Sequence, residues 1–221
     1  MTPRRFCLSA FAAVILIATP AFAGPPLLCF PFEIGSARSL PMGTSSWQAV
    51  DRSYDASHLV ADTIGLLTPQ TPVVVRMETL RRATVYAAKN PQFADALLAA
   101  LEARAGHADA TVGYAVFDFG YLAETYKQAQ WMPGEGAPAA GMHRAIARAK
   151  EIDGYMLVQK AQTLTGDKSI SFALVAMSVD KTRGVDALRA HVAQAREAAK
   201  TDGSLRANLA THWTETTAQF Q

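Results

Sequence analysis

Residues 68–90, TPQTPVVVRMETLRRATVYAAKN, carry the pattern that decides the fold class. Thr71 can cap a helix, and Pro72 suits its first helical position because the missing N–H would have no helical partner there. Apolar or small residues then recur at the spacing of one helix face: Val73, Met77, Leu80, Thr84 and Ala88. The three valines at the start also fit a short strand, but the stripe continues and predicts a helix.

The same signs of helix continue on both sides of this segment. Before it, Asp55 can cap a helix whose apolar residues are one turn apart. After it, Asn90 caps and Gly106 ends a helix that Pro91 starts, and Asp109 begins the next one. Further helical patterns follow at roughly 142–150, 152–164, 168–180, 184–200 and 205–213. The sequence therefore predicts an all-α chain of about nine helices.

Short connections between helices predict antiparallel neighbours that stack as helical hairpins. Few residues separate 72–88 from 91–105, or 168–180 from 184–200. Residues 55–213 thus resemble helical-hairpin repeat proteins such as the tetratricopeptide class, which implies a scaffold that binds a partner. The Trp, Leu-Gly, Tyr, Ala and Pro signature of that class does not recur in register. An irregular bundle is the alternative to a short solenoid.

Residues 24–46, GPPLLCFPFEIGSARSLPMGTSS, differ in composition from the single helical domain predicted over 47–221. Four prolines fix the backbone and remove donors, which disfavours a helix, yet the stretch is too apolar for a disordered linker. We expect an extended arm packed irregularly over the helices. The stretch GPPLLCFPFEIGSARSLP also resembles a group of uncharacterised bacterial secreted proteins, and this resemblance implies no activity.

The first 23 residues have the layout of a secretory signal peptide. Arg4 and Arg5 precede an apolar run that is too short to span a bilayer comfortably, and Ala21 and Ala23 form an A-x-A ending. We expect cleavage between Ala23 and Gly24 and a periplasmic or secreted location. The paired arginines also suggest twin-arginine export, but the residues around them match that signal only loosely, so general secretion is favoured.

The charge of the mature chain argues against some partners. The two arginines of residues 1–23 account for the formal charge of +2, and no later basic run is longer than Arg81–Arg82. A neutral chain lacks the positive field that phosphate backbones require, so we expect no nucleic acid partner. Without an apolar run of about 18 residues after the signal peptide, we also expect no membrane insertion.

None of the familiar catalytic or cofactor motifs is complete. GTSSW at 43–47 lacks the last glycine of a nucleophile elbow, GDKS at 166–169 lacks the first glycine of a phosphate loop, and GEGAPAAG at 134–141 joins no strand to a helix. His58 and Asp62 are one turn apart, but two ligands do not make a metal site. We predict no catalytic residue from a known motif, no metal and no cofactor.

Cys29 is the one cysteine outside the signal peptide. It comes too late after Gly24 for a lipid anchor, and its apolar neighbours would raise the thiol pKa and keep it unreactive. We expect Cys29 to be buried, where it pins the arm to the helices, with an intermolecular disulfide as the alternative.

Two groups of residues are candidates for binding. The first is Arg76, Glu78 and Arg81 in VRMETLRR. Glu78 can pair with Arg82 along the helix surface. Arg81 lies beside the apolar stripe, where a charge needs a partner. We expect Arg81 to be substantially buried and paired with an acid of a neighbouring helix; the alternative is that it clamps an anion or carboxylate.

The second group is an aromatic series on one helix face: Tyr114, Phe117, Tyr121 and Glu124. Such a series fits the core, or a groove for a peptide or glycan. The predicted function is an exported, soluble scaffold that binds a protein or peptide of the cell envelope. The alternatives are a hydrolase-like enzyme using Glu78, Asp118 or Glu124, or a small-ligand binder. A deep cleft around a carboxylate of raised pKa would favour the enzyme.

Overall fold

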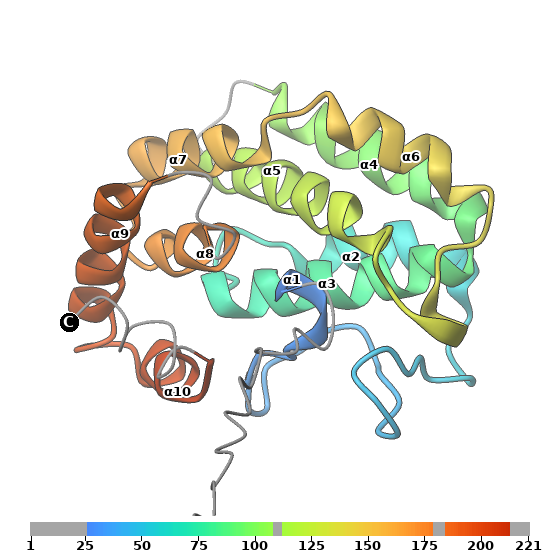
Figure 1. Cartoon of the computed structure of the whole chain (residues 1–221), viewed down its shortest axis with the longest axis horizontal. Coiled ribbons are helices and arrows are strands. Elements are labelled where there is room, and N and C mark those ends of the chain that lie inside the picture. Colours follow the sequence, from blue (N-terminus) through green and yellow to red (C-terminus); the bar gives the residue numbers. More distant parts are fainter. Residues whose placement is uncertain (1–25, 108–111, 179–183, 213–221) are drawn as a thin grey trace, which may run out of the picture.

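The computed structural model describes residues 26–107, 112–178 and 184–212, in which every regular element is a helix (Figure 1). The helices are α1 Pro26–Cys29, α2 Leu59–Leu66, α3 Val73–Lys89, α4 Ala94–Ala105, α5 Val112–Ala129, α6 Met142–Lys150, α7 Gly154–Thr165, α8 Ile170–Met177, α9 Val185–Ala198 and α10 Gly203–His212. Short 3-10 turns span Ala56–His58, Pro91–Phe93 and Gly134–Gly136. The all-α prediction is confirmed. The predicted signal peptide, its cleavage site and the helix start at Asp109 lie outside the described residues.

α5 is the central helix of the bundle. It packs against α1, α3, α4, α6 and α7, and Figure 1 shows it crossing the middle of the molecule, between α7 and α3. α8 and α9 pack against one another, whereas α3 and α4 each make more contact with α5 than with each other. None of the described helices has the length and apolar character that a membrane span requires.

The start of α3 differs in detail from the prediction. The three valines are helical, but Pro72 takes the capping position and Thr71 does not cap the helix. Because Thr71 lies one residue too early, its hydroxyl instead donates to the Leu66 carbonyl at 2.7 Å and closes the preceding turn. Asn90 likewise makes no capping hydrogen bond, since its side chain donates back to the Tyr86 carbonyl.

α5 and α7 touch through glycines. A Cβ on Gly154 would lie 2.3 Å from the Gly120 carbonyl oxygen, and a Cβ on Gly120 would lie 2.8 Å from the Gly154 oxygen. A Cβ on Gly113 would lie 2.5 Å from the Thr165 methyl group. Real Cβ atoms do not approach other atoms so closely, so only glycine allows the two backbones to meet in this way.

Residues 26–41, here called the N-terminal segment, lie against α3, α5, α8 and α10. Their start corrects one expectation, because a single helical turn, α1, forms where proline was expected to prevent a helix. Proline is tolerated in a first turn, where no N–H is needed. Cys29 ends this turn as a free, partly buried thiol rather than a fully buried one, and burial raises its pKa.

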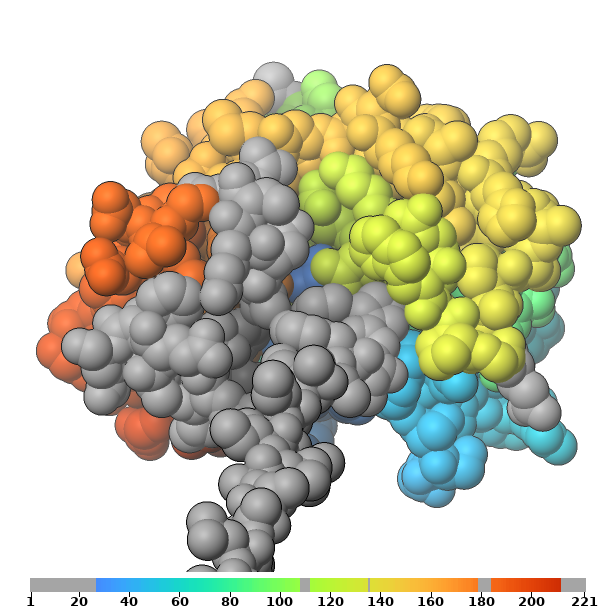
Figure 2. Space-filling view, in the orientation of Figure 1, coloured from blue at the N-terminus to red at the C-terminus, as the bar shows by residue number. Residues whose placement is uncertain are grey.

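The apolar side chains of the N-terminal segment complete the core. Leu27, Leu28, Phe32 and Leu40 all belong to the main hydrophobic cluster. The ring of Phe32 meets that of Phe172 on α8 edge to face, with ring centroids 5.7 Å apart. The loop that follows, around residues 43–55, stands out from the body of the molecule as the light-blue lobe in Figure 2.

Candidate functional site

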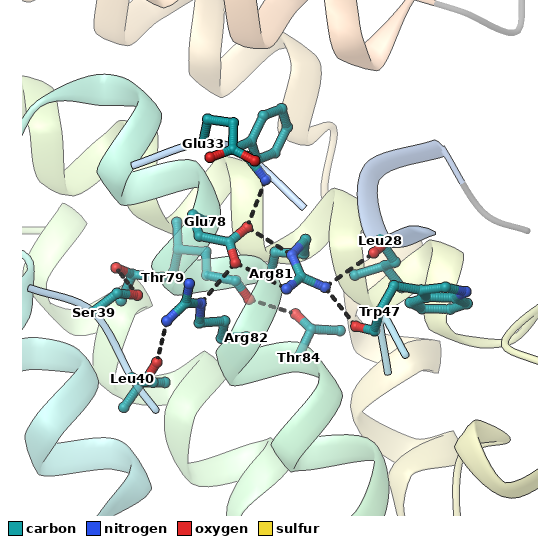
Figure 3. Close-up of polar contacts among 12 residues, drawn as sticks. Leu28, Glu33, Ser39, Leu40, Trp47, Glu78, Thr79, Arg81, Arg82 and Thr84 are labelled. Atoms are coloured by element: carbon teal, nitrogen blue, oxygen red, sulfur yellow. Dashed lines mark hydrogen bonds and ion pairs between the residues drawn. The ribbon is translucent and has the colours of Figure 1, made fainter. Parts of the chain in front are cut away.

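Besides the exposed Ser204 hydroxyl, six side chains from three helices hold the main chain of the N-terminal segment, partly shown in Figure 3. We call them the clasp: Glu78, Arg81, Arg82 and Tyr86 on α3, Gln128 on α5 and Asn208 on α10. They bond backbone groups of six residues: Leu27, Leu28, Phe32, Glu33, Leu40 and Pro41. The segment is therefore held through peptide groups that do not depend on its side chains, apart from the N–H that proline lacks.

Glu78 is the centre of the clasp and is fully buried. Its Oε2 accepts from the Phe32 N–H at 3.0 Å and from Arg81 Nε at 2.7 Å, and its Oε1 accepts from Arg82 Nε at 2.6 Å. Burial acts to raise the pKa of Glu78, but the hydrogen bonds and charges of the two arginines outweigh it and hold the pKa below its usual value. Glu78 is thus a buried carboxylate with two cationic partners.

Arg81 is buried as predicted, with 2% of its surface exposed, but its acidic partner is not on another helix. It pairs with Glu78 on its own helix because the N-terminal segment covers this face of α3 and buries both side chains. The remaining donors of Arg81 reach the Leu28 carbonyl at 3.1 Å and the Trp47 carbonyl at 2.9 Å. The predicted pair of Glu78 and Arg82 does form, at 2.6 Å, but for the same reason Glu78 is buried and not on the surface.

Asn208 closes the clasp from the other end of the chain. Its side-chain oxygen accepts from the Glu33 N–H, and its amide group donates to the Glu33 carbonyl, both at 2.8 Å. This two-point contact resembles the pairing of a neighbouring β-strand and does not involve the Glu33 side chain. Sequence reasoning missed Asn208, together with Gln128 and Tyr86, because one polar residue on a helix carries no sign of its distant partner.

Arg76 belongs to a second buried cluster, and it pairs with an acid of another helix. Its Nη1 donates to both oxygens of Asp118 on α5, at 2.9 and 2.8 Å, while other donors reach the carbonyls of Thr68 and Thr71. The guanidinium lies 4.4 Å over the ring of Tyr114. The Tyr114 hydroxyl donates to Asp167 at 2.9 Å. These contacts link the start of α3 to α5.

Replacing Asp118 by asparagine is expected to remove a pH dependence of stability. Burial raises the pKa of Asp118 to about 6, although Arg76 acts to lower it, whereas the unfolded chain releases this proton near 3.8. Between these values the native state binds more protons, so its stability falls as the pH rises. In urea titrations, the stability of wild type relative to Asp118→Asn should fall by about 2–3 kcal/mol from pH 4 to pH 7. A difference independent of pH would contradict this.

Tyr121 and Glu124 occupy different positions along α5. The Tyr121 ring stacks on Phe117 at 5.7 Å, and its buried hydroxyl has no hydrogen-bond partner among the described residues. Burial, and then the nearby charge of Glu78, raise the pKa of Tyr121. Glu124 accepts from the Gly154 N–H at 3.0 Å and from Lys127, and so ties α5 to α7.

The six predicted binding residues do not form one surface. Glu78 and Arg81 lie in the clasp with Tyr121 nearby, Arg76 and Tyr114 lie with Asp118, and Glu124 lies at the contact with α7. Five of these side chains form hydrogen bonds or ion pairs within the same chain, and Tyr121 is buried with its ring stacked on Phe117. A role for them in binding stays a prediction.

An open cleft of about 550 Å³ lies between the start of α3, the turn from α7 to α8 and the turn from α9 to α10. Its lining includes Asp167, Lys168, Glu197 and Lys200. Asp118, the carboxylate with the raised pKa, does not line it, so the two features that would indicate an enzyme do not coincide there. Within the described residues, no group of three or more His, Cys, Asp or Glu is placed to hold a metal.

No protein-family model, curated protein or solved structure matches this chain. The basis for a function is therefore the geometry of the clasp.

Proposed function

We propose that this protein is an exported helical scaffold that binds a peptide or protein segment of the cell envelope. One observation supports this most strongly: side chains of three helices hold, through its main chain, a segment that is helical only over its first turn. Main-chain hydrogen bonds give affinity for any extended segment, and pockets for its side chains give specificity. The molecule already uses this chemistry on its own residues.

We propose that the scaffold is an irregular helical bundle, with residues 24–46 packed over it as an arm. Contacts of α5 with five other helices fit a bundle better than a short solenoid, in which consecutive hairpins would be the main neighbours. The layout of residues 1–23 supports the periplasmic or secreted location, because such segments direct export and are removed.

Photo-cross-linking in intact cells tests this function. A photoreactive residue at Ser204, an exposed position whose hydroxyl contacts the Glu33 carbonyl at 3.2 Å, should capture a defined envelope protein. The matched control is the same residue at Lys160, an exposed position on α7. Capture of one protein from Ser204 but not from Lys160 is the expected result. Capture from neither, or equally from both, would contradict the proposal.

A further inference from the structure

Residues 27–33 have the features of a ligand that occupies a groove. Their polar contacts with the clasp use main-chain atoms only: the N–H groups of Leu27, Phe32 and Glu33 and the carbonyls of Leu28 and Glu33. Any residue other than proline could form the bonds that use an N–H group, and any residue could form those that use a carbonyl. The clasp therefore recognises a backbone path, a single helical turn followed by residues without regular structure.

The side chains of the same residues separate into two sets. Leu27, Leu28 and Phe32 are buried, with at most 5% of their surface exposed, and they contact the hydrophobic core. Pro31 and Glu33 are exposed, and Phe30 is 49% exposed. The groove thus accepts large apolar side chains at the positions of Leu28 and Phe32, four residues apart; of the positions between them, Phe30 and Pro31 are exposed and Cys29 is partly buried.

We propose that residues 27–33 are an internal ligand and that the partner is a peptide with large apolar side chains at the spacing of Leu28 and Phe32. The peptide binds by displacing these residues from the clasp; this inference rests on the proposed function. A tethered segment acts at a high effective concentration, so it lowers the apparent affinity for a peptide in solution. Weakening the tethered segment should therefore strengthen the binding of the free peptide.

Fluorescence anisotropy with a labelled synthetic peptide tests this competition. The probe has the sequence of residues 26–34 with serine in place of Cys29, and the proteins are full mature chains. Phe32→Ala removes an anchor of the internal ligand and leaves the clasp unchanged, so this variant should bind the probe about tenfold or more tightly than wild type. Adding Asn208→Ala should reverse the gain. A control probe with alanine at the positions of Leu28 and Phe32 should not bind.

Equal binding of the probe by wild type and Phe32→Ala, or binding of the control probe, would overturn the inference. Hydrogen exchange on the wild-type chain covers the case in which Phe32→Ala fails to fold. The amides of Phe32 and Glu33 donate to Glu78 and Asn208, so saturating unlabelled peptide should speed their exchange. Unchanged protection of these two amides would overturn the inference as well.

The two proposals can fail separately. Envelope capture at Ser204 that the unlabelled peptide does not reduce would leave the scaffold function standing and overturn the displacement of residues 27–33. Tight probe binding by Phe32→Ala without envelope capture would support the groove and contradict the envelope partner.

Discussion

Replacing Glu78 by glutamine is expected to lower the free energy of unfolding by about 3–5 kcal/mol. The substitution keeps the size of the side chain but removes the buried negative charge with which both Arg81 and Arg82 pair. Arg81 is 2% exposed and cannot regain water without the N-terminal segment leaving. Urea unfolding at pH 7 measures the loss.

Glu102→Gln is the matched control for Glu78→Gln. Glu102 also pairs with an arginine, Arg148, at 2.8 Å, but both side chains are about half exposed. Exposed pairs of this kind contribute about 1 kcal/mol or less. Similar losses in the two variants would show that burial by the N-terminal segment adds nothing to the Glu78 ion pairs.

Replacing Gly154 by alanine is expected to destabilise the protein by roughly 3 kcal/mol, although alanine usually favours a helix. The new methyl group would lie 2.3 Å from the Gly120 carbonyl oxygen, so α5 and α7 would have to move apart along the central contact of the bundle. Thermal or urea unfolding followed by circular dichroism measures the change.

Gly65→Ala on α2 is expected to have the opposite effect on stability. A Cβ at Gly65 meets no atom within 4 Å outside its own turn of helix, so this variant should gain about 0.5–1 kcal/mol by restricting the unfolded chain. If both glycine substitutions stabilise the protein, the close contact between α5 and α7 does not exist in solution.

The positions of the helices along the chain could largely be predicted, because each amphipathic helix repeats its apolar residues locally. The stripe from Val73 to Ala88 placed α3 correctly, and Gly106 ends α4 as expected. Capping was harder to predict, since a shift of one residue turned Thr71 from a cap into a turn-closing donor. The central place of α5 depends on Gly120 and Gly154, and nothing near either glycine in the sequence indicates the other.

The candidate site could be predicted only in part. The burial of Arg81 could be predicted from its place beside the apolar stripe. Its acidic partner was predicted wrongly, because the N-terminal segment that buries Glu78 lies about 46 positions away in the sequence. The contact between Arg76 and Asp118 joins residues 42 positions apart. Such pairs are fixed by tertiary packing, and the sequence near either member does not identify the other.

The hydrogen bond between Glu33 and Asn208 spans 175 residues and has a consequence for the order of events during synthesis. Residues 27–33 leave the ribosome long before α10 has been made, so Leu28 and Phe32 remain without their full surroundings while the rest of the chain is translated. Contacts between distant residues form late, because closing a long loop costs entropy before any contact repays it. Residues 27–33 are synthesised early but are therefore among the last to gain all their contacts, and their apolar side chains stay open to chaperones until then.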